Sequence, residues 1–386
     1  MDFELSDEQR MLQESAQRFV QNSYTFEHRR HLATQGGGFS RKTWHTLAEM
    51  GWFGIAVPEE MGGLGFSPVE SAIVAEQIGR ALVLEPYVMC GVLPASIVMR
   101  CGREGQRETI LGEIASGEAV YAVAHSERDA RGQLHYVTAT ANQTSDGAWR
   151  LDGYKTLVVG APVADRLLVV ARTGGAVSDT GGIGVFLVDP EQSGVTLKTY
   201  ELLDGTPSAD LLLEGVMVAQ SDVVGDAGRA FEGLQGAVDE AIVALCAELV
   251  GDMEDAIELA SEYLKTRKQF GVAIGTFQAL QHRMADMAIE AMQARATLHR
   301  ALAALSEDSE KRSVEISGCK AQTTRSAKFV TQQGIQLHGG YGITNEYKVG
   351  HHYRRHLVLD TLFGNMDYHL NRYARQIQRE ALAAAA

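Results

Sequence analysis

The chain has 386 residues, of which 45% are hydrophobic and 22% charged, and its formal net charge is −14. A chain of this length is too long for one small core, so two or three domains are expected. The acidic balance argues against a general nucleic-acid surface or an anionic-membrane surface, because both require clustered lysine and arginine. Neither nucleic acid nor a membrane is therefore predicted as a partner.

The four cysteines are far apart in the sequence and form no Cys-x-x-Cys pair. Neither a zinc site nor a disulfide framework is indicated, and no metal is predicted. Residues 1–10 lack the basic and apolar stretches of a secretory signal. No window reaches the roughly 18 uninterrupted apolar residues of a membrane span. A cytoplasmic location with reduced thiols is the prediction.

The first region, to about residue 117, has helical periodicity. Ser6 and Gln9 have the spacing of a capping box, in which each side chain bonds the other residue's backbone amide. The run Ser67–Glu70 supplies a hydroxyl cap, a proline at the first helical position and a carboxylate at the third. Helices are therefore predicted to begin at both places, the second running to about Leu82.

From about residue 118 to 225 the pattern changes to short segments rich in branched residues, separated by Gly, Asp, Asn or Pro. Such segments pack as a small β-barrel or sandwich. Asp152-Gly153 and Asp204-Gly205 are predicted to form two of its tight turns. The expected strands are Tyr121–His125, His135–Thr140, Thr156–Val159, Arg166–Ala171, Gly184–Val188 and Asp210–Leu213.

From about residue 226 helical periodicity returns and continues to the end of the chain. Around Ala241–Val250 the apolar residues occupy nearly every side of the predicted helix, which indicates burial among other helices. Long helices with short connections predict an antiparallel four-helix bundle. The expected helices are about Arg229–Lys265, Thr276–Leu305, Glu310–Gln336 and His356–Arg379.

Two motifs in this last region indicate a dinucleotide. Neighbouring glycines, Gly339-Gly340 within Gln336–Tyr347, let backbone amides approach a phosphate closely. Arg267, three residues before Phe270, can clamp a phosphate, and an arginine beside an aromatic ring can pack on a flat ligand. Each motif alone has an ordinary explanation, since the glycines could form a simple turn and the arginine a solvated helix charge.

The two motifs in this order, with Gln278 between them, resemble the carboxy-terminal half of the acyl-CoA dehydrogenase family. The succession of helices, β-structure and helical bundle is similar over essentially the whole chain. The resemblance implies an α+β fold with an N-terminal helical domain (1–117), a middle β domain (118–225) and a C-terminal four-helix bundle (226–386). It also implies FAD, bound at a subunit interface by Ser126, Arg267, Phe270, Gln278, Gln336, Gly339 and Gly340.

The middle region departs from the family pattern beside the flavin. Family members usually carry Thr-Glu-Pro-x-x-Gly-Ser-Asp, whereas this chain has Ser-Glu-Arg-Asp-Ala-Arg-Gly-Gln at 126–133. Ser126 can replace the threonine hydroxyl, but the Gly-Ser pair is absent. The family's Trp-Ile-Thr corresponds to Leu-Val-Val at 157–159, so one aromatic wall and one hydroxyl are missing.

The largest departure concerns the catalytic base. In many family members a glutamate precedes Gly-Thr near the carboxy terminus, where this chain has Phe363 before Gly364. Other members place the glutamate on the first long helix of the bundle, and the matching positions here are Ala241 and Ile242. None of these three side chains can accept a proton.

Nearby carboxylates are candidates to replace the base. Glu240 is the first of them, because it lies one residue from the alternative site, although that shift turns a helical side chain by about 100°. Asp239 is better explained by binding of the CoA portion, and Asp360 precedes Phe363 by one helical turn. A buried Glu248 would have a raised pKa, as a functional base might, but a structural pair with an arginine is the preferred explanation.

The resemblance implies an enzyme that oxidises a medium-chain or dicarboxyl acyl-CoA to the 2,3-enoyl thioester and passes electrons to an electron-transferring flavoprotein. Within the family the chain is most similar to small subunits of pimeloyl-CoA dehydrogenases, which implies a homo- or hetero-tetramer with a larger subunit. A non-catalytic subunit that completes a neighbour's FAD site, and a flavin oxidase or monooxygenase, are the alternatives. The similarity is carried by Lys265–Gly271, Gln278–Arg283, Glu346–His351 and Asp360–Gly364 with Asp367–His369.

Overall fold

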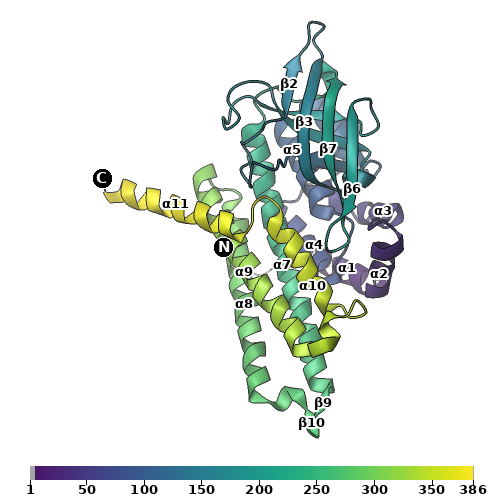
Figure 1. The fold of residues 1–386 in the computed structure, drawn as a ribbon, viewed down its shortest axis with the longest axis vertical. Coiled ribbons are helices and arrows are strands. Elements are labelled where there is room, and N and C mark those ends of the chain that lie inside the picture. Colours follow the sequence, from purple (N-terminus) through teal and green to yellow (C-terminus); the bar gives the residue numbers. More distant parts are fainter. Residues whose placement is uncertain (1–4, 386) are drawn as a thin grey trace. The chain divides into compact units, whose positions relative to one another are not determined.

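The computed structural model describes residues 5–385 (Figure 1). The first four residues of the 1–10 segment, which was considered above as a secretory signal, lie outside the described residues. The chain folds as two compact units. The first unit comprises residues 1–30, 72–83 and 242–386, and the second comprises 31–71 and 84–241. Both units are therefore assembled from segments that are far apart in the sequence.

The region before the sheet is helical, as predicted. Ser6 Oγ accepts from the Gln9 amide at 3.1 Å and Gln9 Oε1 accepts from the Ser6 amide at 3.0 Å, which confirms the capping box. At the second predicted start, Ser67 Oγ accepts from the Val69 amide at 3.2 Å. The helices are α1 (Asp7–Asn22), α2 (Phe26–Gln35), α3 (Arg41–Glu49), α4 (Pro68–Ala81), α5 (Leu93–Cys101) and α6 (Glu104–Ser116).

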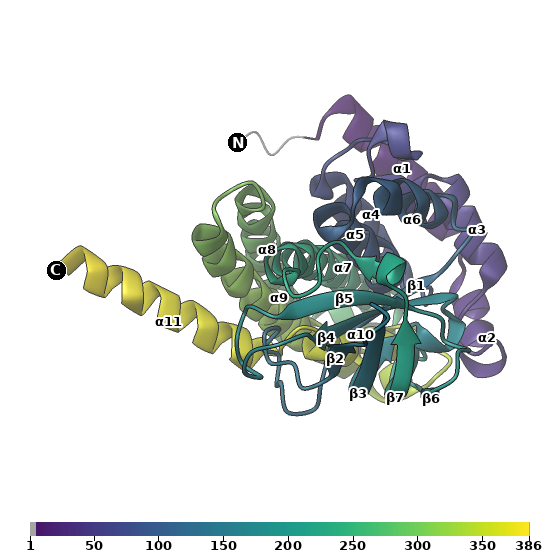
Figure 2. The same ribbon diagram turned by 90° about the horizontal axis from the view of Figure 1, so that it is seen from above.

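A single mixed sheet lies in the second unit (Figure 2). Its strand order is β6-β7-β3-β2-β4-β5-β8, and β1 pairs with β4. The β1–β4 and β2–β4 pairs are parallel and the others antiparallel. The strands are β1 (Tyr121–Ala124), β2 (Thr140–Gln143), β3 (Trp149–Val159), β4 (Arg166–Arg172), β5 (Ile183–Val188), β6 (Val195–Glu201), β7 (Pro207–Val218) and β8 (Val223–Val224).

The strand predicted at His135–Thr140 is wrong, because only Thr140 belongs to a strand. Side chains satisfy much of the backbone of this segment, in addition to the Arg172 amide, which donates to the Ala139 carbonyl at 2.7 Å. Arg172 donates to the carbonyls of His135 at 2.8 Å and Val137 at 3.0 Å. Glu127 accepts from the amides of residues 138 and 139 at 2.8 and 3.1 Å. The branched residues of this segment correctly indicated extended backbone. They did not predict which groups form hydrogen bonds with that backbone.

Asp152-Gly153 does not form the predicted turn. It lies inside β3, where the register with β7 shifts between Leu151 and Gly153 as in a β-bulge. A Cβ on Gly153 would lie 2.5 Å from Ala139 Cβ, so this close approach requires glycine. Asp204-Gly205, in contrast, lies between β6 and β7 in a tight turn, as predicted, with the Leu202 amide donating to the Thr206 carbonyl at 2.9 Å.

The helices after the sheet follow the prediction except near the carboxy terminus. The helix expected over His356–Arg379 is broken, because Phe363 and Gly364 adopt φ values of 60° and 102°. Asn365 then starts a new helix, accepting from the Tyr368 amide at 3.0 Å. The observed helices are α7 (Phe231–Thr266), α8 (Gln278–Ala304), α9 (Ser309–His338), α10 (Val349–Thr361) and α11 (Met366–Ala385).

Every residue of the apolar run Ala241–Val250 on α7 is buried, which confirms that prediction. Across residues 5–385, no helix is both long enough and apolar enough to span a bilayer. The burial of α7 instead comes from packing against other parts of the protein. Glycines permit the closest contacts between α7 and its neighbours.

Helices α4 and α7 touch through their backbones in the first unit. A Cβ on Gly79 of α4 would lie 1.9 Å from the Glu248 carbonyl oxygen of α7. Reciprocally, a Cβ on Gly251 of α7 would lie 1.9 Å from the Glu76 carbonyl oxygen of α4. Only residues without a side chain fit at these two points, so the pair fixes the separation of the helices.

We expect Gly79→Ala to destabilise the protein by about 1–3 kcal/mol, because the added methyl group has to displace backbone. Gly112→Ala on α6 is the matched control, since nothing lies within 4 Å of its Cβ position, and it should stabilise by about 0.5–1 kcal/mol. Urea denaturation of both variants measures the difference. Equal effects of the two substitutions would contradict the packing argument.

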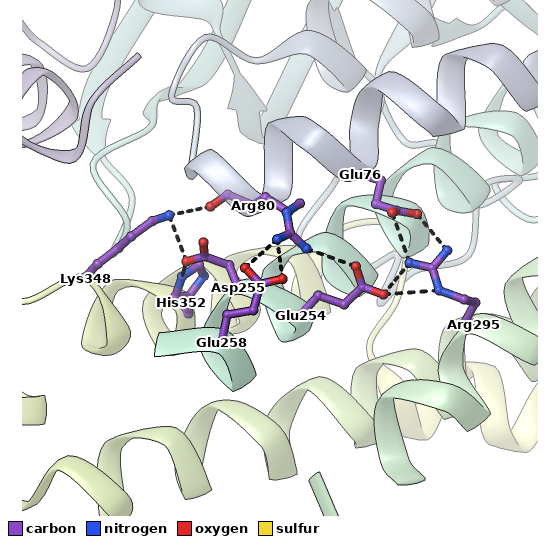
Figure 3. Close-up of polar contacts among 8 residues, drawn as sticks. All are labelled: Glu76, Arg80, Glu254, Asp255, Glu258, Arg295, Lys348 and His352. Atoms are coloured by element: carbon purple, nitrogen blue, oxygen red, sulfur yellow. Dashed lines mark hydrogen bonds and ion pairs between the residues drawn. The ribbon is translucent and has the colours of Figure 1, made fainter. Parts of the chain in front are cut away.

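Ion pairs surround this helix contact (Figure 3). Arg295 of α8 lies 3.0 Å from Glu76 of α4 and 2.5 Å from Glu254 of α7. Arg80 of α4 lies 3.1 Å from Glu254 and 2.6 Å from Glu258. The arginines thus join α4, α7 and α8 through shared carboxylates. Glu76 is 12% exposed and Glu258 is 62% exposed, so the charge of Glu76 depends most strongly on its arginine partner.

The network continues through a buried histidine. His352 of α10 has Nδ1 2.5 Å from Asp252 and Nε2 2.6 Å from Asp255, and both carboxylates belong to α7. Lys348 lies 2.8 Å from Asp255 and donates to the Arg80 carbonyl at 2.6 Å. Burial opposes the charged forms, but the carboxylates raise the pKa of His352. Burial alone would raise the pKa of Asp255, but His352 and Lys348 lower it to about 2.

The Asp255 pKa predicts acid sensitivity. A carboxyl with a folded pKa near 2 and an unfolded pKa near 3.9 contributes about 2 kcal/mol of stability above pH 5. This contribution is lost as the pH falls, and about 1 kcal/mol of it should disappear between pH 6 and pH 3. The destabilisation caused by Asp255→Asn should therefore shrink over that range in denaturation measurements. A pH-independent difference would refute the assignment.

Candidate functional site

A cavity of about 310 Å³ lies in the second unit, between the 52–68 segment, α5 and the first part of α7. Its walls are mostly apolar and include Trp52, Phe53, Phe66 and Met99. A polar group formed by Ser96, Arg100 and Glu240 also lines it. An apolar cavity with a few convergent polar groups is the usual form of a small-molecule site.

Glu240, the first candidate for the base, reaches this cavity from α7. One carboxylate oxygen accepts from Arg100 and the other from Ser96, both on α5. Ser96 and Arg100 share a helix face, and the Arg100 Nε lies 3.2 Å from the Ser96 hydroxyl. The Glu240 side chain is 13% exposed and that of Arg100 is 36% exposed. Glu240 is thus a paired carboxylate with limited access to water.

The other carboxylates named from the sequence have structural partners. Glu248 is buried and accepts from Arg355 Nε at 2.6 Å, which confirms the arginine pair suggested as its alternative. Asp360 accepts from the Met366 amide at 2.9 Å and so joins the ends of α10 and α11. Asp239 is buried and accepts from Gln235 at 3.0 Å on the same helix.

Left-handed backbone is concentrated in the segments that the sequence singled out. Leu157, Phe270 and Phe363 have φ values of 55°, 52° and 60°, and Arg131 has 46°. The Cβ atom clashes with the backbone in this conformation, so a residue other than glycine keeps it only where the surroundings impose it. Such strain is common at ligand sites, which directs attention to these segments independently of any motif.

Arg267 and Phe270 lie at a short hairpin of β9 (Lys268–Gln269) and β10 (Val272–Ala273) in the first unit. Phe270 is 92% exposed. Within residues 5–385 the Arg267 side chain has neither an ion pair nor a hydrogen bond. Gln278, also exposed, is the first residue of α8. The hairpin therefore presents an unpaired cation and a bare aromatic ring to solvent.

Gln336, Gly339 and Gly340 lie at the end of α9, and the structure brings them close to the same hairpin. Tyr263, which accepts from the Arg267 amide at 2.8 Å, has its ring centroid 4.5 Å from that of His338. No described heavy atom lies within 4 Å of a Cβ built on either glycine. An open glycine pair beside a cation fits a diphosphate, because backbone amides and guanidinium both favour phosphate oxygens.

Ser126 follows β1 in the second unit, and a buried ion pair holds its loop. Glu127, the next residue, lies 2.6 Å from Lys155 of β3, with side-chain exposures of 3% and 0%. The Ser126 carbonyl accepts from the Thr156 amide at 2.9 Å. Among the described residues, the Ser126 hydroxyl has no hydrogen-bond partner, so it is free to bind a ligand.

Sequence reasoning missed the Glu127–Lys155 pair. Burial disfavours both charges, yet Lys155 and the Thr138 and Ala139 donors together lower the pKa of Glu127. Burial also lowers the pKa of Lys155, against the opposing effect of Glu127. A lysine within the apolar pattern of a strand was the available signal, since an unpaired buried lysine is rare.

Comparison with known proteins identifies the chain. Residues 6–118, 122–216 and 231–378 match the family models of the N-terminal, middle and C-terminal domains of acyl-CoA dehydrogenase. A 3-(aryl)acrylate reductase of Clostridium sporogenes is 31% identical over 82% of this chain and 84% of its own length. The chain belongs to the acyl-CoA dehydrogenase family. The resemblance expected from the sequence is confirmed at this level, and so are the three structural regions.

Solved structures of the acyl-CoA dehydrogenase family share its fold. A glutaryl-coenzyme A dehydrogenase in complex with glutaryl-CoA superimposes with a TM-score of 0.89 at 26% identity, over 97% of this chain and 96% of the other. The ChsE4-ChsE5 complex of Mycobacterium tuberculosis gives a TM-score of 0.87 at 27% identity, over 98% and 99%. The likeness thus extends over nearly the whole of each chain.

We expect Lys155→Met to destabilise the protein by about 3–5 kcal/mol, because Glu127 would keep a buried charge without a partner. Lys155→Met combined with Glu127→Gln should recover part of the loss, since the charge is then removed. The half-exposed Arg41–Asp165 pair of the same unit provides the control, and Arg41→Met should cost about 1 kcal/mol or less. Denaturation midpoints measure all three variants. A loss for Lys155→Met no larger than that for Arg41→Met would contradict the importance of the buried pair.

Proposed function

We propose that the protein is an FAD-dependent acyl-CoA dehydrogenase, or a subunit of one. The substrate is a medium-chain or dicarboxyl acyl-CoA such as pimeloyl-CoA, and the product is the 2,3-enoyl-CoA. Electrons pass to an electron-transferring flavoprotein. The observation that carries the proposal is the apolar cavity with Glu240 in its wall, in a chain of this family. The proposed domains are residues 1–117, 118–225 and 226–386.

FAD is the proposed cofactor, and the residues present suit it. The free guanidinium of Arg267 and the open backbone at Gly339 and Gly340 bind the diphosphate. Gln278, Gln336 and the exposed ring of Phe270 bind the rest of the adenosine diphosphate portion, and Ser126 hydrogen-bonds the flavin edge. When bound, the flavin supplies the acceptor for the hydride that leaves the substrate's β carbon.

The chain's own residues then position the acyl group and move a proton. Trp52, Phe53 and Met99 bury the acyl methylenes, each of which contributes about 0.8 kcal/mol when removed from water. Glu240 accepts the α proton of the thioester at one carboxylate oxygen. Arg100 donates to that carboxylate and orients it before the transfer. Ser96 donates to the second oxygen and holds the carboxylate in place during the transfer.

A non-catalytic subunit is the second candidate, and the engagement of Glu240 favours it. Both of its oxygens already accept hydrogen bonds, as they would in a purely structural pair. In this case Arg267 and the glycine pair complete the FAD site of a larger acyl-CoA dehydrogenase chain. The heteromeric ChsE4-ChsE5 complex is a precedent for two such chains assembling.

Exposed apolar side chains support assembly with other chains, proposed as a homo- or hetero-tetramer. Phe270 is 92% exposed, and Met292 and Ile289 on α8 are 71% and 52% exposed. Apolar residues gathered on one element are characteristic of a surface that a partner covers. The hairpin and α8 are therefore the proposed contact, which places the diphosphate-binding residues next to a second subunit.

Anaerobic titration with pimeloyl-CoA tests the activity. We expect the flavin absorbance of the purified protein, alone or with its partner chain, to bleach as the substrate is oxidised. If Glu240 is the base, Glu240→Gln should lower the rate of bleaching by about 10²–10⁴-fold. Glu232→Gln, an exposed glutamate on the same helix, should leave the rate unchanged.

The outcomes separate the candidates. Unchanged turnover of Glu240→Gln in the reconstituted complex supports the non-catalytic subunit and removes Glu240 from the mechanism. Failure of bleaching with pimeloyl-CoA, octanoyl-CoA and other acyl-CoA thioesters, in the presence of every candidate partner chain, would overturn both the activity and the substrate class.

A further inference from the structure

The glycine segment, residues 339–347, joins α9 to α10 in the first unit and contains the open glycine pair. No described heavy atom lies within 4 Å of a Cβ built on Gly339 or Gly340, so close packing at that position does not hold the pair in place. The backbone amides of the two glycines can point at a ligand only if the rest of the segment is fixed. Contacts made by Asn345 and Tyr347 fix it.

A tyrosine ties the glycine segment back to α9. The Tyr347 hydroxyl lies 3.1 Å from Nε2 of His338, the last residue of α9. The other ring nitrogen of His338, Nδ1, lies 2.7 Å from the Gly334 carbonyl oxygen. A carbonyl oxygen only accepts, so Nδ1 carries the proton and Nε2 accepts from the tyrosine hydroxyl. This contact closes the segment on the helix that precedes it.

The following helix holds Asn345 at two points. Arg354 of α10 donates to the Asn345 side-chain oxygen at 2.6 Å. His351 of α10 has Nε2 3.1 Å from the Asn345 backbone carbonyl oxygen. The His351 side chain is buried, whereas Asn345 is exposed. The imidazole is therefore the buried anchor for the backbone of the glycine segment.

Arg29 of α2 reaches the other nitrogen of this imidazole. Its Nη1 lies 2.7 Å from His351 Nδ1, and its Nε donates at 3.3 Å to the carbonyl of Leu82, the residue after α4. Arg29 is 1% exposed. The ring of Phe26, also on α2, packs edge-on against the imidazole with centroids 5.0 Å apart. Residues from α2, from the end of α4 and from α10 thus meet at His351.

The guanidinium determines which imidazole nitrogen carries the proton. A guanidinium has donors and no acceptor, so His351 Nδ1 is unprotonated and accepts from Arg29. In the neutral ring the proton is then on Nε2, which faces the Asn345 carbonyl oxygen. Burial and the charge of Arg29 lower the pKa of His351 to about 4, so the ring is neutral near pH 7. The opposite tautomer would direct a nitrogen lone pair at the carbonyl oxygen.

We propose that Arg29 is a positioning residue for the cofactor site and acts through His351. Arg29 fixes the Nε2–H tautomer, the imidazole holds the Asn345 carbonyl, and Asn345 holds the segment whose glycine amides receive the diphosphate. The inference rests on the proposed function, in which FAD binds at Arg267 and the glycine pair. A side chain from the amino-terminal helices thereby contributes to a diphosphate site whose other residues follow the sheet.

A purely structural contact between α2 and α10 makes a different prediction. In that case the imidazole would only fill a buried space, and an apolar side chain of similar size would serve as well. The proposed role instead requires an N–H donor directed at the Asn345 carbonyl. Glutamine at position 351 keeps such a donor and an oxygen that can accept from Arg29, whereas leucine has neither.

Equilibrium dialysis of the flavin-containing protein, with its partner chain where one is required, measures FAD affinity. His351→Leu should weaken FAD binding about fivefold, which corresponds to one lost hydrogen bond, and Arg29→Met about two- to fivefold. His351→Gln should weaken it less than about twofold, because donor and acceptor are retained. Arg18→Met on α1 removes the same charge from a side chain that is 68% exposed, and should leave the affinity unchanged.

Nitrogen-15 NMR of the histidine-labelled protein tests the tautomer directly, because a protonated ring nitrogen resonates far from an unprotonated one. The His351 signals are assigned by their loss in His351→Gln. We expect a protonated Nε2 and an unprotonated Nδ1 in the wild-type protein at pH 7. In Arg29→Met, exchange between the two tautomers should shift both signals toward each other. This measurement does not depend on FAD binding.

The outcomes separate this inference from the proposed function. A proton on His351 Nδ1 in the wild-type protein, FAD binding in His351→Leu as tight as in His351→Gln, or an Arg29→Met variant with unchanged tautomer and affinity would overturn the role of Arg29 alone. Failure of the wild-type protein to hold FAD, or unchanged affinity in Arg267→Ala, would overturn the proposed cofactor site and the role of Arg29 with it. If one variant does not fold, the others and the wild-type tautomer decide.

Discussion

The pairing of carboxylates on one buried helix is the constraint on which this structure depends. α7 runs for 36 residues and contributes to both compact units. Several of its acidic side chains are buried, and an unpaired buried charge costs several kcal/mol. Glu240 is paired with Arg100 in the second unit, while Glu248 pairs with Arg355 and Asp255 with Lys348 in the first. The partners come from α5, from α10 and from the residue that precedes α10, so pairing also selects which segments pack on α7.

The same constraint shapes two cavities, the Glu240 cavity of the second unit and a cavity of about 370 Å³ in the first unit, between α1, α4 and α7. Each is lined by a paired carboxylate of α7, Glu240 in one cavity and Asp255 in the other. In the Glu240 cavity the surrounding wall is apolar, which suits an acyl chain. In the other cavity the charged groups are paired with one another, Arg80 with Glu258 and Lys348 with Asp255. One helix thus supplies acidic groups to two chemically different environments.

The wrong predictions have a common physical origin in long-range contacts. At His135–Thr140 the side chains of Arg172 and Glu127 satisfy the backbone that a strand would otherwise have paired. At Gly153 the close approach of Ala139 requires a glycine within a strand, where Asp-Gly normally indicates a turn. Local patterns measure the preference of a segment for extended or helical backbone. They do not report which distant side chain or backbone lies against it.

The sequence by itself determined the succession of helices, sheet and helices, the two capped helix starts and the burial of Ala241–Val250, because these depend on local periodicity and composition. It also identified the family through the Arg267 and Gly339-Gly340 motifs. Only the tertiary structure decided that Glu240 lies in a cavity with Arg100, and that Arg29 meets His351. Those properties depend on residues up to 322 positions apart meeting in space, and no local pattern encodes such a meeting.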